Sequence, residues 1–157
     1  LQSLTPKPSR EFFDADFFSY KEDIDLAYRL VWRGWDAYYL PRVLAWHARS
    51  VGGSEDLSDA ATARGRKGKR TIVTRWSYRN HLGFLVKNVS ARTWRRYGLR
   101  IGWYELKKIA WILFFEWRTL HALTQFIRLL PRFFNKRAHI MRTRKITDQH
   151  IWKLMSQ

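Results

Sequence analysis

The feature that most constrains the fold is a helical pattern of apolar residues that begins near residue 71 and continues almost to the C-terminus. Its clearest part is a stripe at spacings of three and four residues, which is typical of one side of an amphipathic helix. The stripe comprises Leu106, Ile109, Leu113, Trp117, Leu120, Leu123, Ile127 and Leu130. Breaks are predicted near Ser90, between Gly98 and Gly102, and at Pro131. This part of the chain is therefore predicted to be mainly α-helical.

Charge is distributed unevenly between the two parts of the chain. Residues 1–60 carry a net charge of −3 and residues 61–157 a net charge of +20, which together make the +17 of the whole. Such asymmetry predicts a polyanionic partner for the second part, either nucleic acid or an anionic lipid surface. Trp and Phe interleaved with Arg and Lys favour the membrane interface.

Composition excludes several kinds of chemistry. The chain has no Cys, so disulfides, thiolate catalysis and zinc sites built on sulfur are ruled out.

The first residues lack the apolar segment of a signal peptide. The longest apolar run without charge, from Ile109 to Phe115, has seven residues, whereas a membrane-spanning helix needs about 20. The length suits one domain.

The first third predicts mixed structure. A helix is expected from about Glu22 to Arg33, ended by Gly34 in the position after the C-cap. Two short strands are expected at "DAYYLP" and "VLAWHA" (residues 36–41 and 43–48). Residues 51–70 are polar and contain glycine without periodicity, which predicts a mobile loop.

Three carboxylates stand in the first turn of the expected helix. Helical rotation predicts a solvated face made of Glu22, Asp25, Arg29 and Arg33, and a core stripe made of Ile24, Ala27, Tyr28 and Val31. Asp23 falls on the apolar side. Acids in a first turn commonly cap free N–H groups and complement the helix dipole. A carboxylate facing a packed interior is costly unless it is paired or used, so a chemical role for Asp23 is the alternative.

A histidine and a pair of aspartates raise the possibility of a metal site. His47 closes the second expected strand, where a histidine is either a hydrogen-bonded structural residue or a ligand. Asp14 and Asp16 have the spacing of a D-x-D metal motif, but a proline-rich stretch precedes them. They are better interpreted as a turn whose Asp side chains bond the backbone.

The stretch "FFDADFFSYKEDIDLAYRLVWRGWDAYYLPRVLAWH" resembles the C-terminal part of the catalytic domain of family 2 glycosyltransferases, in particular bacterial rhamnosyltransferase-like members. "RWSYRN" and the basic C-terminal segment resemble that family's helical tail. The resemblance implies an α/β fold: the end of a GT-A type domain at residues 1–50, with one helix and two short strands, then the loop at 51–70 and a mainly α-helical basic tail at 71–157.

The resemblance also implies an activity, the inverting transfer of a sugar from a nucleotide-sugar donor to a cell-surface glycan or a lipid-linked acceptor. Rhamnose is the most familiar donor sugar. Asp23 would be the general base that takes the proton of the acceptor hydroxyl, and Glu22 would orient the site. Tyr20, Asp25 and Arg29 would contact substrate. His47 would join a Mg²⁺ or Mn²⁺ site that neutralises the departing diphosphate.

The family's nucleotide-binding half is missing from this sequence. The chain is therefore expected to be a C-terminal fragment that neither binds nor transfers a sugar alone. We also expect peripheral attachment to the cytoplasmic face of the plasma membrane through residues of about 90 to 135. The expected membrane or phosphate contacts are Arg75, Arg79, Trp103, Lys107, Lys108 and Trp111.

Two alternatives of another class stay open. The basic clusters "RGRKGKR" (64–70) and "RTRK" (142–145) would suit a nucleic-acid-binding module, although no binding-motif spacing predicts a specific nucleic acid. A basic helical domain with a purely structural role is the other alternative.

Overall fold

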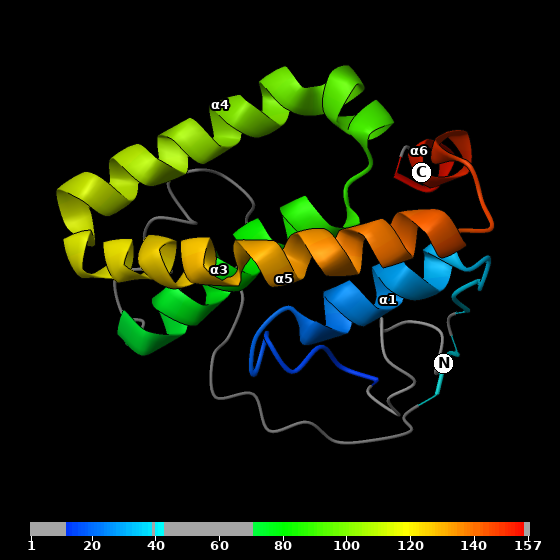
Figure 1. The fold of residues 1–157 in the computed structure, drawn as a ribbon, viewed down its shortest axis with the longest axis horizontal. Helices are drawn as coiled ribbons and strands as arrows, with labels where there is room; N and C mark the ends of the chain where they lie inside the picture. The colour runs from blue at the N-terminus through cyan, green and yellow to red at the C-terminus, as the bar shows by residue number, and fades with distance from the viewer. Residues whose placement is uncertain (1–11, 39, 43–70, 156–157) are drawn as a thin grey trace.

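The computed structural model describes residues 12–38, 40–42 and 71–155, and the regular structure within those ranges is helical (Figure 1). The elements are α1 (Glu22–Trp32), α3 (Thr71–Asn88), α4 (Ala91–Phe115), the 3-10 turn η2 (Trp117–Leu120), α5 (His121–Thr143) and α6 (Asp148–Met155).

The long helices form a hairpin on a supporting layer. α4 runs to one end of the molecule, the chain turns at η2, and α5 returns along α3 (Figure 1). α1 lies beside the C-terminal half of α5, and the short helix α6 follows α5 at the other end from the turn (Figure 1).

Two small apolar cores hold this arrangement together. Near the hairpin turn, Tyr78 of α3, Ile112 of α4 and Ala122 of α5 are buried against one another. At the opposite end, Trp32, Ile140 and Ile151 join α1, α5 and α6. The indole Nε1 of Trp32 also donates to the backbone oxygen of Asn88, at 3.0 Å. Each core thus joins two consecutive helices to a third that lies earlier in the sequence, α3 in the first core and α1 in the second.

The predicted α/β fold class is wrong. Residues 36–38 and 40–42 are irregular, and no strand occurs in the described ranges. A strand is stable only when a neighbouring strand satisfies its backbone groups, and these residues have no such neighbour there. The second predicted strand, the loop at 51–70 and His47 lie outside the described residues.

The predicted helix breaks are correct at one place of three. The break near Ser90 is confirmed, because its hydroxyl accepts the Thr93 N–H and caps α4. The breaks at Gly98–Gly102 and at Pro131 are wrong, since α4 and α5 continue through them. A glycine costs a helix only about 1 kcal/mol, and tertiary packing of α4 and α5 offsets such local costs.

The helix at residues 22–32 is confirmed, and Gly34 follows it with φ +80°. Its predicted faces are wrong. Asp25 and Arg29, expected in solvent, are buried at 0% and 3% exposure, whereas Ile24 is 47% exposed. Periodicity shows where an apolar stripe lies, but here the buried face carries charges whose partners come from α3.

Gly83 allows α5 to approach α3 closely. A Cβ at this position would lie 2.7 Å from Cζ of Phe133, which is fully buried. We expect Gly83→Ala to lower the free energy of unfolding by about 1–3 kcal/mol, because overpacking outweighs the better helix propensity of alanine.

Gly102 is the matched control, since nothing lies within 4 Å of a Cβ placed there. Gly102→Ala should raise the free energy of unfolding by up to about 1 kcal/mol. Urea denaturation of both variants checks the pair, and equal effects would contradict the close approach of α3 and α5.

Candidate functional site

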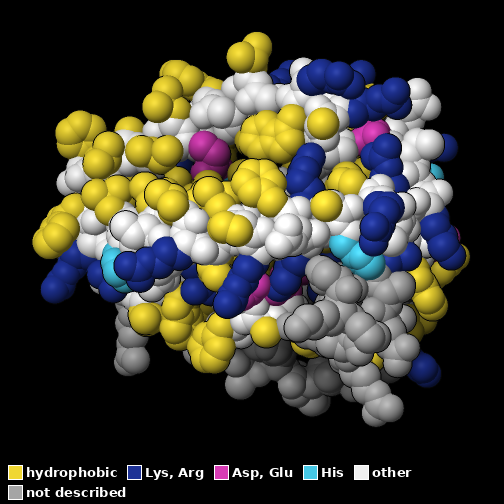
Figure 2. Space-filling view, viewed as in Figure 1, with side chains coloured by type: hydrophobic (Ala, Val, Ile, Leu, Met, Phe, Trp, Pro, Cys, Tyr) yellow, Lys and Arg dark blue, Asp and Glu magenta, His cyan; other side chains and the backbone are white. Residues whose placement is uncertain are grey.

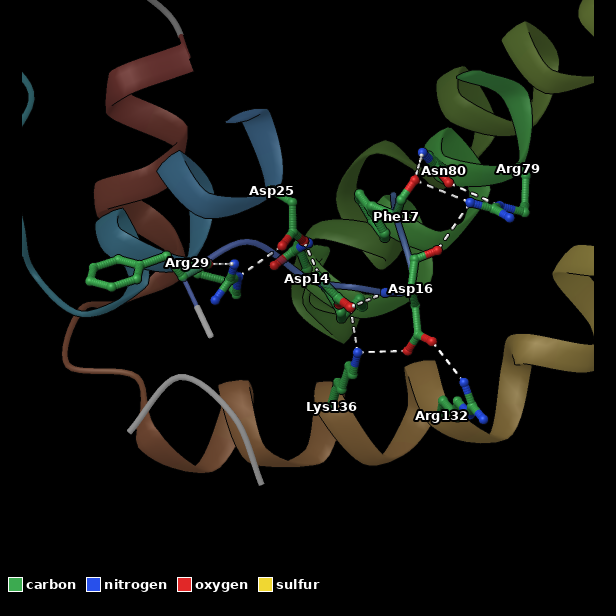
Figure 3. Close-up of polar contacts among 12 residues, drawn as sticks. Asp14, Asp16, Phe17, Asp25, Arg29, Arg79, Asn80, Arg132 and Lys136 are labelled. Carbon is green, nitrogen blue, oxygen red and sulfur yellow. Dashed lines mark hydrogen bonds and ion pairs between the residues drawn. The ribbon is translucent and has the colours of Figure 1, made fainter. Parts of the chain in front are cut away.

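The segment of residues 12–17 is held against the helices by ion pairs. Asp14 pairs with Lys87 of α3 and with Lys136 of α5, and Asp16 pairs with Lys136 at 2.6 Å and with Arg132 at 2.9 Å (Figure 3). The backbone N–H of Asp16 also bonds Oδ1 of Asp14, at 3.0 Å. The Asp side chains therefore build a turn, as predicted, and they face lysine and arginine.

Asp25 is a third carboxylate of this group, and it shares Lys87 with Asp14. Its carboxylate accepts Nε of Arg29 at 2.8 Å, and it lies 2.7 Å from Nζ of Lys87 and from Nδ2 of Asn88. Arg29 in turn donates to the backbone oxygen of Phe12 at 2.7 Å. The two predicted substrate contacts Asp25 and Arg29 are thus engaged with each other inside the protein.

An asparagine shapes the chain between this cluster and α1. Phe18, Tyr20 and Lys21 have positive φ values of 57°, 71° and 67°, a region that non-glycine residues occupy at a cost. Nδ2 of Asn80, which is fully buried, lies 2.7 Å from each of the backbone oxygens of Phe17, Ser19 and Tyr20 (Figure 3 labels Asn80 and Phe17). These bonds from α3 thereby fix the backbone conformation that places Tyr20, Glu22 and Asp23.

The predicted base, Asp23, lies on the surface. Its side chain is exposed, and Oδ1 accepts the backbone N–H of Ile24 at 2.8 Å. The prediction that it faces a packed interior is wrong. Glu22 is half-buried, and its Oε2 is buried without a hydrogen-bond partner among the described residues. Asp23 is accessible to a substrate, but the structure does not bring it together with Asp25 or Arg29.

No group of three or more His, Asp or Glu side chains within the described ranges is arranged to hold a metal ion. Asp14 and Asp16 do not provide one, because Lys87 and Lys136 already lie against their oxygens. The predicted ligand His47 is outside the described residues.

Sequence reasoning missed a titratable pair between α3 and α4. Nε2 of His81 lies 2.6 Å from Oε1 of Glu105. Burial lowers the pKa of His81 more than the hydrogen bond to Glu105 raises it. The pKa of Glu105 is lowered because His81, Lys108 and Lys21 outweigh its burial. No local motif signals this pair, since its members are 24 residues apart.

The side of α4 that faces away from α3 and α5 carries exposed side chains of two kinds. We call it the outer face; its exposed residues are Arg92, Arg95, Arg96, Leu99, Arg100, Trp103, Leu106, Lys107, Leu113 and Phe114. The C-terminal end of the outer face continues into the hairpin tip, which we define as Leu113, Phe114, Phe115 and Trp117, and these side chains are 53–80% exposed. Figure 2 shows apolar side chains gathered at the turn of the hairpin and basic ones above the start of α4.

Of the predicted membrane contacts, some are exposed on the outer face and others are engaged with groups of the protein itself. Trp103 and Lys107 are exposed on the outer face. Arg79 donates to the backbone oxygens of Asp16 and Phe17, and Lys108 lies 5.0 Å above the Tyr78 ring. Two others are bound near the hairpin turn: Arg75 Nε donates to the Arg118 backbone oxygen at 2.8 Å, and Trp111 Nε1 donates to Oε1 of Glu116 at 2.9 Å.

The comparisons with known proteins found no matching family model, no matching characterised protein and no matching solved structure. Together with the helical fold, this corrects the resemblance to family 2 glycosyltransferases: a GT-A identity is not supported. Within the described residues, no helix is both long and apolar enough to cross a bilayer.

Asp14 should make the fold sensitive to acid. Burial raises its pKa, but the charges and hydrogen bonds of Lys87 and Lys136 outweigh burial and lower the pKa from 3.8 to about 2. The stabilisation is therefore complete above pH 3.8 and is lost as the pH falls to about 2. The shift corresponds to about 2 kcal/mol.

Urea unfolding across this pH range checks the effect. The free energy of unfolding of the wild type should fall more steeply with acid than that of Asp14→Asn, whereas the exposed Asp36→Asn should follow the wild type. Parallel curves for the wild type and Asp14→Asn would contradict the assignment. If Asp14→Asn does not fold, the same comparison is made with Lys136→Gln, which removes one of the two cations that lower the pKa of Asp14.

Proposed function

We propose that this chain binds an anionic membrane surface through the outer face of α4 and the hairpin tip. The observation that carries the proposal is that exposed arginines and exposed large apolar side chains share one continuous helix surface. Exposure to water is favourable for the charged arginines but unfavourable for the apolar rings of Phe114, Phe115 and Trp117. A membrane interface suits both kinds, because headgroups attract cations and the acyl boundary accepts apolar rings.

The charge of the chain supports an anionic lipid as the partner. Four arginines are exposed between residues 92 and 100, and each basic residue near an anionic leaflet contributes about 1 kcal/mol. Four such contacts together contribute about 4 kcal/mol, which by itself corresponds to about millimolar attachment, and burial of the apolar side chains of the tip adds to it. The same attraction favours the cytoplasmic leaflet of the plasma membrane, where anionic lipids are concentrated.

Nucleic acid is a less suitable partner. A phosphate backbone would neutralise the arginines but would leave the apolar tip in water. Of the two basic clusters, the one at 64–70 lies outside the described residues. In the other, Arg144 pairs with Asp148 at 3.2 Å and lies 5.6 Å from the Trp32 ring, so this arginine serves the fold.

Co-sedimentation with vesicles tests the proposal. The chain should bind vesicles of phosphatidylcholine and phosphatidylglycerol, and binding should weaken with salt and be nearly absent with phosphatidylcholine alone. The triple variant Phe114→Ser, Phe115→Ser, Trp117→Ser should bind at least about tenfold more weakly, because three large apolar side chains no longer leave water.

The control replaces apolar side chains that are equally exposed but belong to another part of the surface. Trp35 and Tyr38 are 65% and 84% exposed after α1, and Trp35→Ser with Tyr38→Ser should bind like the wild type. Equal binding to neutral and anionic vesicles, or an equal loss in both sets of variants, would overturn the proposal.

Sugar transfer to a hydroxyl acceptor is a second candidate function, which the accessible carboxylate of Asp23 supports. A surface carboxylate can accept a proton from a bound hydroxyl. A chain with this activity should release nucleotide from a nucleotide sugar in the presence of Mg²⁺ or Mn²⁺, and the release should be lost in Asp23→Asn and kept in Asp36→Asn. No release by the wild-type chain would rule this candidate out.

A further inference from the structure

The exposed surface of α4 changes in character along the helix. Its first half presents Arg92, Arg95, Arg96 and Arg100 around Leu99, which is 94% exposed. After Lys108 the sequence has no Lys or Arg until Arg118. The two ends of α4, which has 25 residues, are separated by roughly 37 Å at about 1.5 Å per residue. A helix with cations at one end and apolar side chains at the other does not suit a position parallel to a flat membrane.

The acid near the tip is turned into the protein. Glu116 is the one carboxylate between Lys108 and Arg118, and an exposed negative charge there would oppose entry into an anionic leaflet. Its Oε1 accepts Nε1 of Trp111 at 2.9 Å, and its Oε2 lies 3.4 Å from the hydroxyl of Thr119. Both oxygens therefore have donors from neighbouring residues.

The backbone of the turn is also hydrogen-bonded, which matters because unsatisfied backbone groups are costly in hydrocarbon. The N–H of Glu116 donates to Ile112, and that of Thr119 donates to Glu116 at 2.6 Å. The backbone oxygen of Arg118 accepts Nε of Arg75 at 2.8 Å. Thr119 is fully buried, and its hydroxyl lies 3.1 Å from that of Thr74. The polar atoms named here are thus satisfied from inside, while the apolar side chains point outward.

We propose that the hairpin tip enters the acyl region of an anionic leaflet while the arginines of the first half of α4 stay at the headgroups, so that α4 lies oblique to the membrane. The inference rests on the proposed membrane function and adds its geometry. The last two turns of α4 span about 10 Å, which matches the depth of about 5–10 Å that interfacial helices reach. Trp117, 69% exposed beside the tip, suits the boundary region where tryptophan gathers.

Depth-dependent fluorescence quenching tests this orientation. Because the chain has no Cys, Leu99→Cys, Leu106→Cys and Phe114→Cys each accept one polarity-sensitive label at an exposed site, with Tyr38→Cys as the outside control. On vesicles of phosphatidylcholine and phosphatidylglycerol, the label at 114 should be quenched several-fold more by mid-chain nitroxide lipids than by headgroup nitroxides. The label at 99 should show the reverse, and the label at 106 should be intermediate.

The outcomes separate this inference from the proposed function. Co-sedimentation with equal depths at 99 and 114 would retain membrane binding but overturn the oblique insertion. Co-sedimentation without mid-chain quenching at 114 would overturn it too. If no variant co-sediments, the proposed function itself fails. Concentration-dependent self-association that shields the label at 114 without vesicles would assign the tip to a second copy of the chain instead.

A pair of substitutions tests the role of Glu116. Trp111→Phe removes the indole N–H but keeps a ring beside Phe115, whose centroid lies 4.4 Å from that of Trp111. It should weaken vesicle binding several-fold, since the carboxylate loses a donor. Adding Glu116→Gln should restore binding, because the charge is gone. Equal binding by wild type and Trp111→Phe, or no restoration in the double variant, would overturn the role of the inward-turned carboxylate.

Discussion

The structure depends on one buried ammonium group. Lys87 is 1% exposed near the end of α3, and its Nζ lies against the carboxylates of Asp14 and Asp25 and 4.5 Å from the Phe17 ring centre. A buried cation is tolerated only when such partners surround it, and losing one partner typically costs about 3–5 kcal/mol. Lys87 thus joins the segment of residues 12–17, α1 and α3 at one point.

This arrangement explains why Asp14, Asp16 and Asp25 are structural. Asp14, Asp16 and Asp25 form ion pairs with lysines and arginines of α3, α5 and α1, so the negative part of the chain folds onto the positive part. The acids cancel basic residues of the inner layer, whereas the arginines of α4 stay exposed. The charge asymmetry of the sequence therefore serves the fold on the inside and leaves an excess of positive charge on the outside.

The candidate membrane surface follows from the same separation between helix faces that pack inside and helix faces that stay exposed. α3 and α5 pack closely through Gly83 and Phe133, and α4 is tied to them by Ile112, by the His81–Glu105 pair and by Lys108. The stripe expected as one helix side is divided by the turn at Glu116. Its members Ile109, Leu120 and Leu123 pack into the core, whereas Leu113 and Trp117 are exposed at the tip. A folded hairpin needs only part of the stripe, and the remainder is available to a partner.

Local patterns in the sequence determined the helix at 22–32 with Gly34 at its end, the helix start at Ser90, the absence of a long apolar span and the concentration of positive charge in the second part. These are properties of neighbouring residues. The sequence did not reveal that Asp25 and Arg29 are buried, that Asp23 is exposed, or that α4 and α5 pass through glycine and proline without a break. Only the tertiary structure decided the burial of Asp25 and the path of the chain that leads to Asp23, because Lys87 and Asn80 lie some 60 residues from the groups they bind, and pairing over such distances leaves no trace in local periodicity. The continuity of α4 and α5 likewise depends on packing against other helices, which offsets the local cost of glycine and proline.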